Sequence, residues 1–297
     1  MKQVIILIIM SMPLFASCDS IVKLITSRTG KIITRETSEN ITEGVTESTT
    51  IKIAKELAAE AGEVMATKTI SKSLKELASS NKTLSFFYDI FQRRINQDFA
   101  DNIMVSIADN GISLISKDFP NSAIRVNKNI VIGKAGSTKI SGHVNEFFNY
   151  LLPNKSYMVD DAFIYNTDNL GRVVNCSADR TKAYRTIERN SQRNSSIQNM
   201  VIDILDGRKG YDDAGHLFAN NTGGPNELIN QVPMSSSLNR HGKWRELEMI
   251  EENALKEGKS VISKRNLLYR DKAKRPYAIE FVSIIDGIET RTLIENI

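Results

Sequence analysis

Cysteine, proline and tryptophan are scarce in this sequence of 297 residues, which contains 2 cysteines, 6 prolines and 1 tryptophan. So few cysteines exclude a disulfide framework, and the low glycine and proline content excludes collagen-like and low-complexity classes. No repeat at a fixed period is visible. The composition, 41% hydrophobic and 25% charged, is that of a globular chain with room for one large domain or two moderate ones.

A strong charge of one sign is also missing. Lys and Arg total 39 and Asp and Glu total 35, which gives a net charge of +4. This value is too small to imply binding to polyanions from bulk electrostatics alone. A function on nucleic acid would therefore have to rest on a local site.

The N-terminal apolar run is short. It extends from Val4 to Met10 and on to Cys18, about 14 residues where a bilayer span needs roughly 20, and it ends in small residues like a cleavable export signal. The pentapeptide 14–18, LFASC, resembles the lipobox of bacterial lipoproteins, whose cysteine is diacylated and becomes the first mature residue. An ordinary secretory signal with an incidental cysteine is the alternative. The resemblance implies a signal peptide over 1–17, with Cys18 anchored in the lipid bilayer of the cell membrane or outer membrane.

Three further segments follow the signal. Residues 18–50 are rich in Ser, Thr and charge and predict a tether. Residues 51–149 predict a spacer domain that is helical and then mixed, and residues 150–297 predict an α+β domain. The expected helices cover 51–65, 70–77, 84–99 and 243–256, and the expected strands cover 112–115, 130–132, 157–159, 163–165, 261–269 and 277–285.

Candidate site residues gather in the C-terminal half. His216 follows a glycine at a strand-like position, a second short strand begins near Asn230, and Asn239 leads onto the helix expected over 243–256. Hydrolysis of a phosphodiester needs a base that deprotonates water and positive charge beside the phosphate oxygens. A neutral imidazole suits the first task, and Mg²⁺ held by few protein oxygens suits the second. His216 and Asn239 fit these two roles.

This arrangement resembles the DNA/RNA non-specific endonuclease family of the ββα-metal, or His-Me finger, superfamily, and is most similar to its branch of bacterial secreted toxins and extracellular nucleases. The resemblance runs from about residue 152 to 259 and includes the strand-turn at 165–172. It implies a ββα-metal domain with an antiparallel sheet. It also implies His216 as general base, Asn239 as ligand of Mg²⁺ (or Mn²⁺), Asn230 as an orienting residue and Glu248 as the holder of a metal-bound water.

Two departures from the family pattern leave alternatives open. Ala214 stands where many relatives carry an arginine that assists phosphate binding, so Arg208 or Arg240 is the expected substitute. One extra residue separates Asn239 from Trp244, which makes Glu246 a rival of Glu248. The carboxylate of Asp213 is interpreted as an acceptor that steadies the loop before His216.

The sequence thus predicts a metal-dependent endonuclease without sequence preference, exported and lipid-anchored, that acts on DNA, RNA or both. Two basic stretches, at 180–193 and 264–275, are expected to grip the phosphate backbone. An antibacterial toxin would be accompanied by an immunity protein, whereas nucleic-acid scavenging or DNA uptake would not. The alternative function is a non-catalytic surface lipoprotein whose degenerate nuclease fold binds nucleic acid or a protein partner.

Overall fold

The computed structural model describes residues 70–108, 111–119, 122–136, 144–185 and 195–297. The chain divides into two compact units, 1–66 and 67–297, and the described residues all belong to the second. The predicted signal peptide, Cys18, the tether and the helix over 51–65 therefore lie outside the described residues. Among the helices that are described, none has the length and apolar character needed to span a bilayer.

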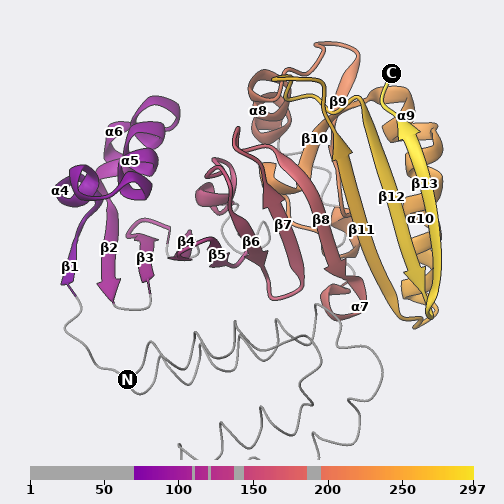
Figure 1. The fold of residues 1–297 in the computed structure, drawn as a ribbon, viewed down its shortest axis with the longest axis horizontal. Coiled ribbons are helices and arrows are strands. Elements are labelled where there is room, and N and C mark those ends of the chain that lie inside the picture. Colours follow the sequence, from indigo (N-terminus) through magenta and orange to yellow (C-terminus); the bar gives the residue numbers. More distant parts are fainter. Residues whose placement is uncertain (1–69, 109–110, 120–121, 137–143, 186–194) are drawn as a thin grey trace, which may run out of the picture. The chain divides into compact units, whose positions relative to one another are not determined.

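A single mixed sheet forms the framework of this unit (Figure 1). Its strand order follows the sequence from β1 to β8 and continues with β11, β12 and β13. Within it β5 pairs with β6 in parallel and the other neighbours pair antiparallel. The strands are β1 (Ile70–Ser73), β2 (Ile103–Ala108), β3 (Gly111–Ser116), β4 (Ala123–Asn127), β5 (Ile130–Gly133), β6 (Ser156–Val159), β7 (Phe163–Thr167), β8 (Val173–Asp179), β11 (Val261–Leu268), β12 (Ala278–Ile285) and β13 (Ile288–Glu295). Together with the helices, this sheet confirms the predicted α+β class.

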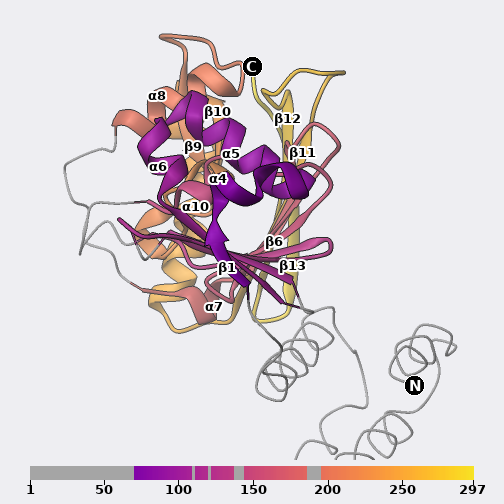
Figure 2. The same cartoon turned by 90° about the vertical axis from the view of Figure 1, so that its left-hand side faces the viewer.

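Short helices pack on the N-terminal part of the sheet, as Figure 2 shows for α4, α5 and α6 near β1. They are α4 (Leu74–Leu77), α5 (Lys82–Arg94) and α6 (Gln97–Asp101), with a 3-10 turn η2 (Ala78–Ser80) between the first two. Phe87 and Phe91 on α5 are fully buried, and both rings lie 5.2 Å from that of Phe147, in the 3-10 turn η3 (Glu146–Phe148). The apolar stripe predicted for this helix is therefore its core-facing side.

Two sequence predictions in this region need correction. Residues 70–73 form β1 and pair with β2, so the helix expected over 70–77 is only the single turn of α4. The helix expected over 84–99 is broken, because the side chain of Asn96 caps α6 by accepting a hydrogen bond from the backbone N–H of Phe99.

The sheet continues across the domain boundary that the sequence predicts at residue 150. The boundary falls between β5 and β6, which pair directly from Ile130 opposite Ser156 to Gly133 opposite Val159. Side chains from both sides of residue 150, such as Phe148 and Tyr157, share one hydrophobic core. The division into a spacer and a nuclease domain stays a prediction.

The C-terminal elements agree closely with expectation. Helix α10 (Lys243–Lys256) ends before Gly258, whose φ of 77° suits a residue without a side chain. Strands β11 and β12 match the predicted strands within a residue. Asp286 and Gly287 have φ of 48° and 82° and form the tight turn that leads from β12 into β13.

Asn296 ties the sheet to the segment that carries the candidate site. Its side chain, in a residue only 2% exposed, accepts from the backbone N–H of Ser235 at 2.8 Å and donates to the carbonyls of Pro233 and Pro276 at 2.9 and 2.8 Å. Replacement by alanine would leave three buried backbone groups without these partners. We expect Asn296→Ala to lower the free energy of unfolding by about 2 to 4 kcal/mol in urea titrations.

A matched control for this prediction is Asn127→Ala, because the side chain of Asn127 is exposed at the end of β4. It should leave the urea midpoint unchanged. Equal midpoints for the two variants would show that Asn296 does not anchor the hairpin.

Candidate active site

A two-stranded hairpin and two helices carry the predicted site residues. Strand β9 (Asp212–His216) pairs antiparallel with β10 (Gln231–Ser235), so that His216 lies opposite Gln231. Helix α9 (Ser236–His241) follows β10 directly, and α10 follows after Gly242. A side chain at position 215 would lie 2.8 Å from that of Met234, which explains why a glycine precedes His216.

His216 ends β9 as a partly buried imidazole. Its Nε2 lies 3.2 Å from Oδ1 of Asn226, in the loop between the two strands. Burial lowers the pKa of His216 below its ordinary value of 6.5, and the contact with Asn226 opposes this shift only in part. The ring is therefore neutral at pH 7, which is the form that can accept a proton.

Asn230 is fully buried and lies in the 3-10 turn η5 (Leu228–Asn230). Its Oδ1 accepts from the hydroxyl of Tyr165 and from the backbone N–H of Phe218, both at 3.0 Å. Its Nδ2 donates to the carbonyls of Phe218 and Pro225 at 2.9 and 2.7 Å. The side chain thus joins β7, the segment after His216 and the start of β10, so its contacts suit an orienting role.

Asp213 connects β9 to α9. Its carboxylate accepts hydrogen bonds from Ser236 Oγ at 3.0 Å and from Asn239 Nδ2 at 3.1 Å. Arg240 donates two more, from Nε at 2.7 Å and from Nη2 at 2.6 Å. Since a carboxylate can only accept, the amide nitrogen of Asn239 has to face Asp213, and its Oδ1 stays available as an oxygen ligand.

The substitutes expected for the missing arginine are both engaged with carboxylates. Arg240 forms a bidentate ion pair with Asp213, and Arg208 forms an ion pair with Asp212 at 2.9 Å. Ala214 is 6% exposed and packs with Ile197 and Val201 of α8 (Ser195–Ile204). An arginine at position 214 would have to enter this apolar cluster.

Helix α10 separates the two rival glutamates. Glu246 has a side chain 55% exposed and pairs with Lys243 at 3.0 Å. The side chain of Glu248 is only 11% exposed and lies 3.4 Å from Arg245. Burial raises the pKa of Glu248 to about 7, against the opposing effect of Arg245. Of the two, only Glu248 faces the interior of the domain.

The structure therefore brings two of the predicted site residues, Asn239 and Arg240, together. Asn239 and Arg240 meet at Asp213, three residues before His216, which is about 10 Å along a strand. In the described part of the chain His216 and Asn239 share no hydrogen bond. That the two side chains face one reaction centre stays a prediction.

The family model for DNA/RNA non-specific endonucleases matches residues 153–287, which span the hairpin, α9, α10 and the flanking strands. The chain carries a DNA/RNA non-specific endonuclease domain. Type VII secretion system protein EssD of Staphylococcus aureus, in strains USA300 and NCTC 8325 / PS 47, is 30% identical over 142 residues, 46% of this chain. These residues make up 22% of EssD, so the chain spans about a fifth of the length of these relatives.

Two solved structures are also similar. An extracellular endonuclease is 18% identical, with 50% of this chain and 82% of that chain covered and a TM-score of 0.32. The structure of Sda1 nuclease with bound zinc ion is 21% identical, with 29% of this chain and 40% of that chain covered and a TM-score of 0.28.

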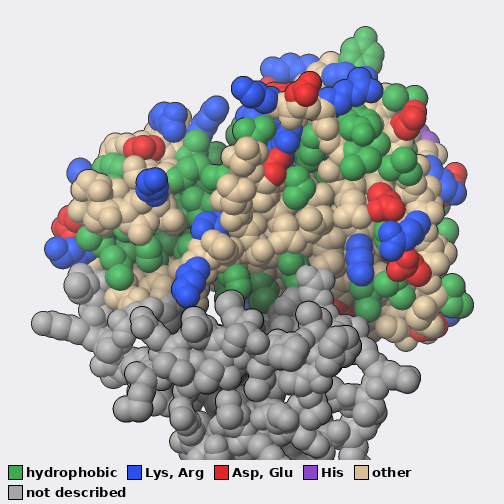
Figure 3. Space-filling view, viewed as in Figure 1, with side chains coloured by type: hydrophobic (Ala, Val, Ile, Leu, Met, Phe, Trp, Pro, Cys, Tyr) green, Lys and Arg blue, Asp and Glu red, His purple; other side chains and the backbone are tan. Residues whose placement is uncertain are grey.

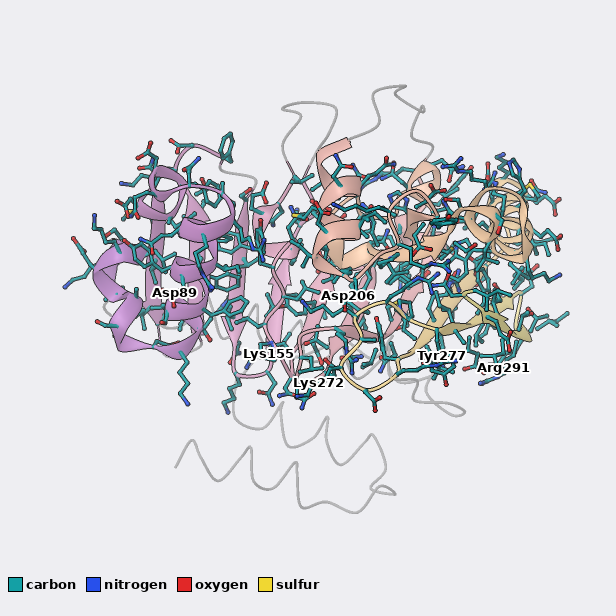
Figure 4. The ribbon with its side chains drawn as sticks, turned by 90° about the horizontal axis from the view of Figure 1, so that it is seen from above. Asp89, Lys155, Asp206, Lys272, Tyr277 and Arg291 are labelled. Carbon is teal, nitrogen blue, oxygen red and sulfur yellow. The ribbon has the colours of Figure 1, made fainter. Side chains whose placement is uncertain are left out.

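The basic stretches of the endonuclease domain are only partly exposed. Arg265 is 0% exposed, Arg180 is 1% exposed, and Arg275 pairs with the buried carboxylate of Asp212 at 2.7 Å. These three arginines are therefore not free to grip a phosphate backbone, as the sequence predicted for the two stretches. Exposed cations do gather along the upper edge in Figure 3, over the loops that precede β9 and join β11 to β12. Lys272 and Tyr277 of the second loop are labelled in Figure 4.

The donor set fits a hard divalent cation. Oδ1 of Asn239 is the type of oxygen ligand that Mg²⁺ and Mn²⁺ prefer, and Mg²⁺ usually keeps several waters beside one or two protein ligands. Within the described ranges, no three His, Cys, Asp or Glu side chains come close enough to form a metal cluster. Asn239 is therefore the candidate ligand, with Glu248 as the candidate partner of a coordinated water.

Two groups around the candidate active site were not predicted. Asn226 contacts His216 but belongs to no motif, and only its place in the loop between two short strands points toward the site. Arg265 and Glu251 form a buried ion pair behind Leu217, the residue after His216. No local pattern marks either pair, because the partners lie 10 and 14 residues apart.

Proposed function

We propose that this protein is an exported, lipid-anchored endonuclease that hydrolyses phosphodiester bonds of DNA and RNA without reading their sequence. The single observation that carries the proposal is the placement of a neutral imidazole and an oriented carboxamide on one hairpin-helix unit of the endonuclease domain. Asp213, three residues before His216 on β9, links the two by accepting a hydrogen bond from Asn239. The similarity to nucleases supports the reaction class.

In the proposed mechanism, His216 acts as general base and takes a proton from the attacking water. A divalent cation held at Asn239 would supply positive charge beside the phosphate oxygens. Asn230 keeps the segment after His216 in place through its contacts with Phe218. Arg240, with a side chain 54% exposed, can contact a phosphate only through the part of its guanidinium group that Asp213 leaves free.

Export and the biological role rest on other features. The lipobox-like residues 14–18 support anchoring through Cys18, and the name of the relative, a type VII secretion system protein, supports export. An antibacterial toxin with a matching immunity protein would agree with such a relative.

The deciding experiment incubates the full chain with plasmid DNA and with RNA in a series of Mg²⁺, Mn²⁺, Ca²⁺ and Zn²⁺. We expect cleavage of both substrates with Mg²⁺ or Mn²⁺, complete loss in EDTA and recovery when the ion is restored, because the proposed mechanism needs a divalent cation to supply positive charge beside the phosphate oxygens. Binding to nucleic acid without cleavage under all ions would contradict the proposal and favour the non-catalytic lipoprotein.

A further inference from the structure

The sheet ends at β13, which Figure 1 shows at its right-hand edge, and in the described part of the chain no strand pairs with the outer side of β13. We propose that this edge binds a second copy of the chain, so that two β13 strands pair antiparallel about a two-fold axis at Leu293. The inference goes beyond the proposed function, because the surface lies outside the candidate active site and its pairing requires no cleavage of nucleic acid.

Strand β13 has the features of an edge that can pair. Its register with β12 is continuous from Ala278 opposite Glu295 to Ile285 opposite Ile288, without a bulge. Its eight residues include no proline, and its Ile and Thr residues favour an extended backbone. Edge strands that resist pairing are short, bulged or interrupted by proline. Since β13 is none of these, the charges along it decide what can pair with it.

The backbone groups of the odd-numbered residues of β13 point toward the open edge. Ile285 and Ile288 flank the two-residue turn, and residues in that position of a hairpin exchange hydrogen bonds. The N–H of Asn296 also bonds to the carbonyl of Tyr277 at 2.8 Å. Even-numbered residues therefore bond toward β12, because alternate residues of an antiparallel strand bond to opposite sides. The N–H and C=O groups at positions 289, 291, 293 and 295 are left for another strand.

The side chains of these odd-numbered residues lie on the face of the sheet opposite α10. Thr292 is paired with Phe281, which packs against α10. Because side chains alternate along a strand, Arg291, Leu293 and Glu295 lie on the other face. Leu293 is 63% exposed, Glu295 is exposed, and the side chain of Arg291, labelled in Figure 4, is 57% exposed.

The order of these three side chains makes the edge complementary to itself. Leu293 stands midway between Arg291 and Glu295, two residues from each. In an antiparallel pair centred on Leu293, each Arg291 faces Glu295 of the second copy and the two Leu293 side chains face each other. Two ion pairs then flank one apolar contact. A two-fold axis uses the same patch on both copies, so this charge pattern favours a second copy over a different partner.

Other symmetric registers of the same two strands are less favourable. An axis at Glu289 or at Arg291 places like charges opposite each other, and an axis one residue before Leu293 sets Glu289 against Glu295. An axis at Thr290 avoids this, but the turn before β13 shortens the overlap. That register forms about four backbone hydrogen bonds between the copies, whereas the register centred on Leu293 forms about six.

The contacts of Arg291 within one chain do not prevent this pairing. Arg291 pairs with Glu289 at 2.6 Å and with Glu280 at 3.5 Å, and all three side chains are partly or largely exposed. Exposed pairs of this kind contribute little to stability, so the guanidinium can turn toward the edge at low cost. Since one strand from each copy makes a small interface, we expect a dissociation constant on the order of 10 µM. The monomer therefore prevails in dilute solution.

Sedimentation velocity of the full chain over a dilution series measures the association. We expect a monomer–dimer equilibrium between about 1 and about 300 µM. Arg291→Glu sets carboxylates against each other at both ion pairs and should weaken the dimer by about 10-fold. The double variant Arg291→Glu with Glu295→Arg reverses both signs and should restore the dimer. A native chain that stays monomeric over the series, or a double variant as weak as the single one, would overturn the inference.

Cysteine cross-linking tests the register. In a Cys18→Ser background, the buried Cys176 is the only other thiol. Leu293→Cys places two thiols at the axis, on residues with Cα atoms about 5.5 Å apart, which suits a disulfide. We expect diamide to link this variant into dimers. Thr290→Cys should stay unlinked, because the two positions lie about 20 Å apart in this register. Linking of Thr290→Cys but not of Leu293→Cys would overturn the inference.

The matched control is Lys264→Glu, which makes the same change of charge on the same face of the sheet. Lys264 is exposed on β11, in line with Arg291 but two strands from the edge. Its variant should keep the native dissociation constant. A loss of dimer as large as that of Arg291→Glu would mean that net charge governs association and would refute edge pairing. Should Arg291→Glu not fold, Glu295→Arg sets two arginines against each other, and an unweakened dimer in that variant overturns the inference.

Discussion

Replacement of His216 by alanine is expected to lower kcat for plasmid cleavage by about 100- to 10,000-fold, the usual contribution of a general base. Burial lowers the pKa of the ring below 6.5, so the neutral form dominates at pH 7 and can take a proton directly from water. KM should change little, because the imidazole does not bind the phosphate backbone. Initial rates on supercoiled plasmid measure both constants.

The control for this prediction is His241→Ala. His241 ends α9 with an exposed side chain, in the same helix as Asn239. It should keep native activity, which would exclude a general effect of histidine loss or of damage to α9. Native cleavage rates in His216→Ala would show that His216 is not the general base.

The sign of the pH dependence follows from the same pKa. A base whose pKa is lowered stays active to lower pH, because it is protonated only when the pH falls through the lowered value. The acidic limb of kcat/KM for the native chain should therefore lie below pH 6.5. A limb above this value would mean that another group titrates.

Local signals explain which elements the sequence predicted. Helix α10 has Trp244, Glu251 and Leu255 on its buried side, and its length and the glycine after it are encoded within a few residues. The same helical phase distinguishes Glu248 from Glu246, since Glu248 follows Trp244 by four residues and Glu246 by two. The choice between them was therefore within reach of the sequence.

Long-range pairing explains what the sequence did not reveal. Arg275 resembled a surface cation among other basic residues, yet its partner Asp212 lies 63 residues away. Burial raises the pKa of Asp212, but hydrogen bonds from Arg275 and Arg208 lower it to about 2. No spacing rule connects such positions, and the continuous sheet through residue 150 depends on the same kind of contact between β5 and β6.

A buried ion pair that the sequence did not reveal holds the residue after His216 in place. Arg265 on β11 donates from Nη2 to Glu251 of α10 at 3.0 Å and from Nε to the carbonyl of Leu217 at 3.1 Å. Its guanidinium carbon lies 3.3 Å from the ring centroid of Phe281. One side chain thus fixes α10, the sheet and the residue after His216 relative to one another.

Arg265→Met is expected to lower the free energy of unfolding by about 3 to 5 kcal/mol, because it leaves the charge of Glu251 buried without its cation. Guanidinium titrations of the full chain measure the loss. Methionine keeps most of the side-chain volume, so a cavity contributes little. Activity should fall as well, since the carbonyl of Leu217 loses its donor next to the base.

The double variant Arg265→Met with Glu251→Gln separates charge from packing. A neutral glutamine at 251 can still accept from Ser263, which bonds the native carboxylate at 2.7 Å, and from Ser283. Removing the buried charge should therefore restore a large part of the stability that Arg265→Met loses. Arg291→Met, which breaks an exposed pair with Glu289, should leave the midpoint unchanged. A double variant as unstable as the single one would show that the ion pair is not what stabilises this part of the domain. The stabilising contacts would then be the packing of the guanidinium on Phe281 and its hydrogen bonds to backbone carbonyls.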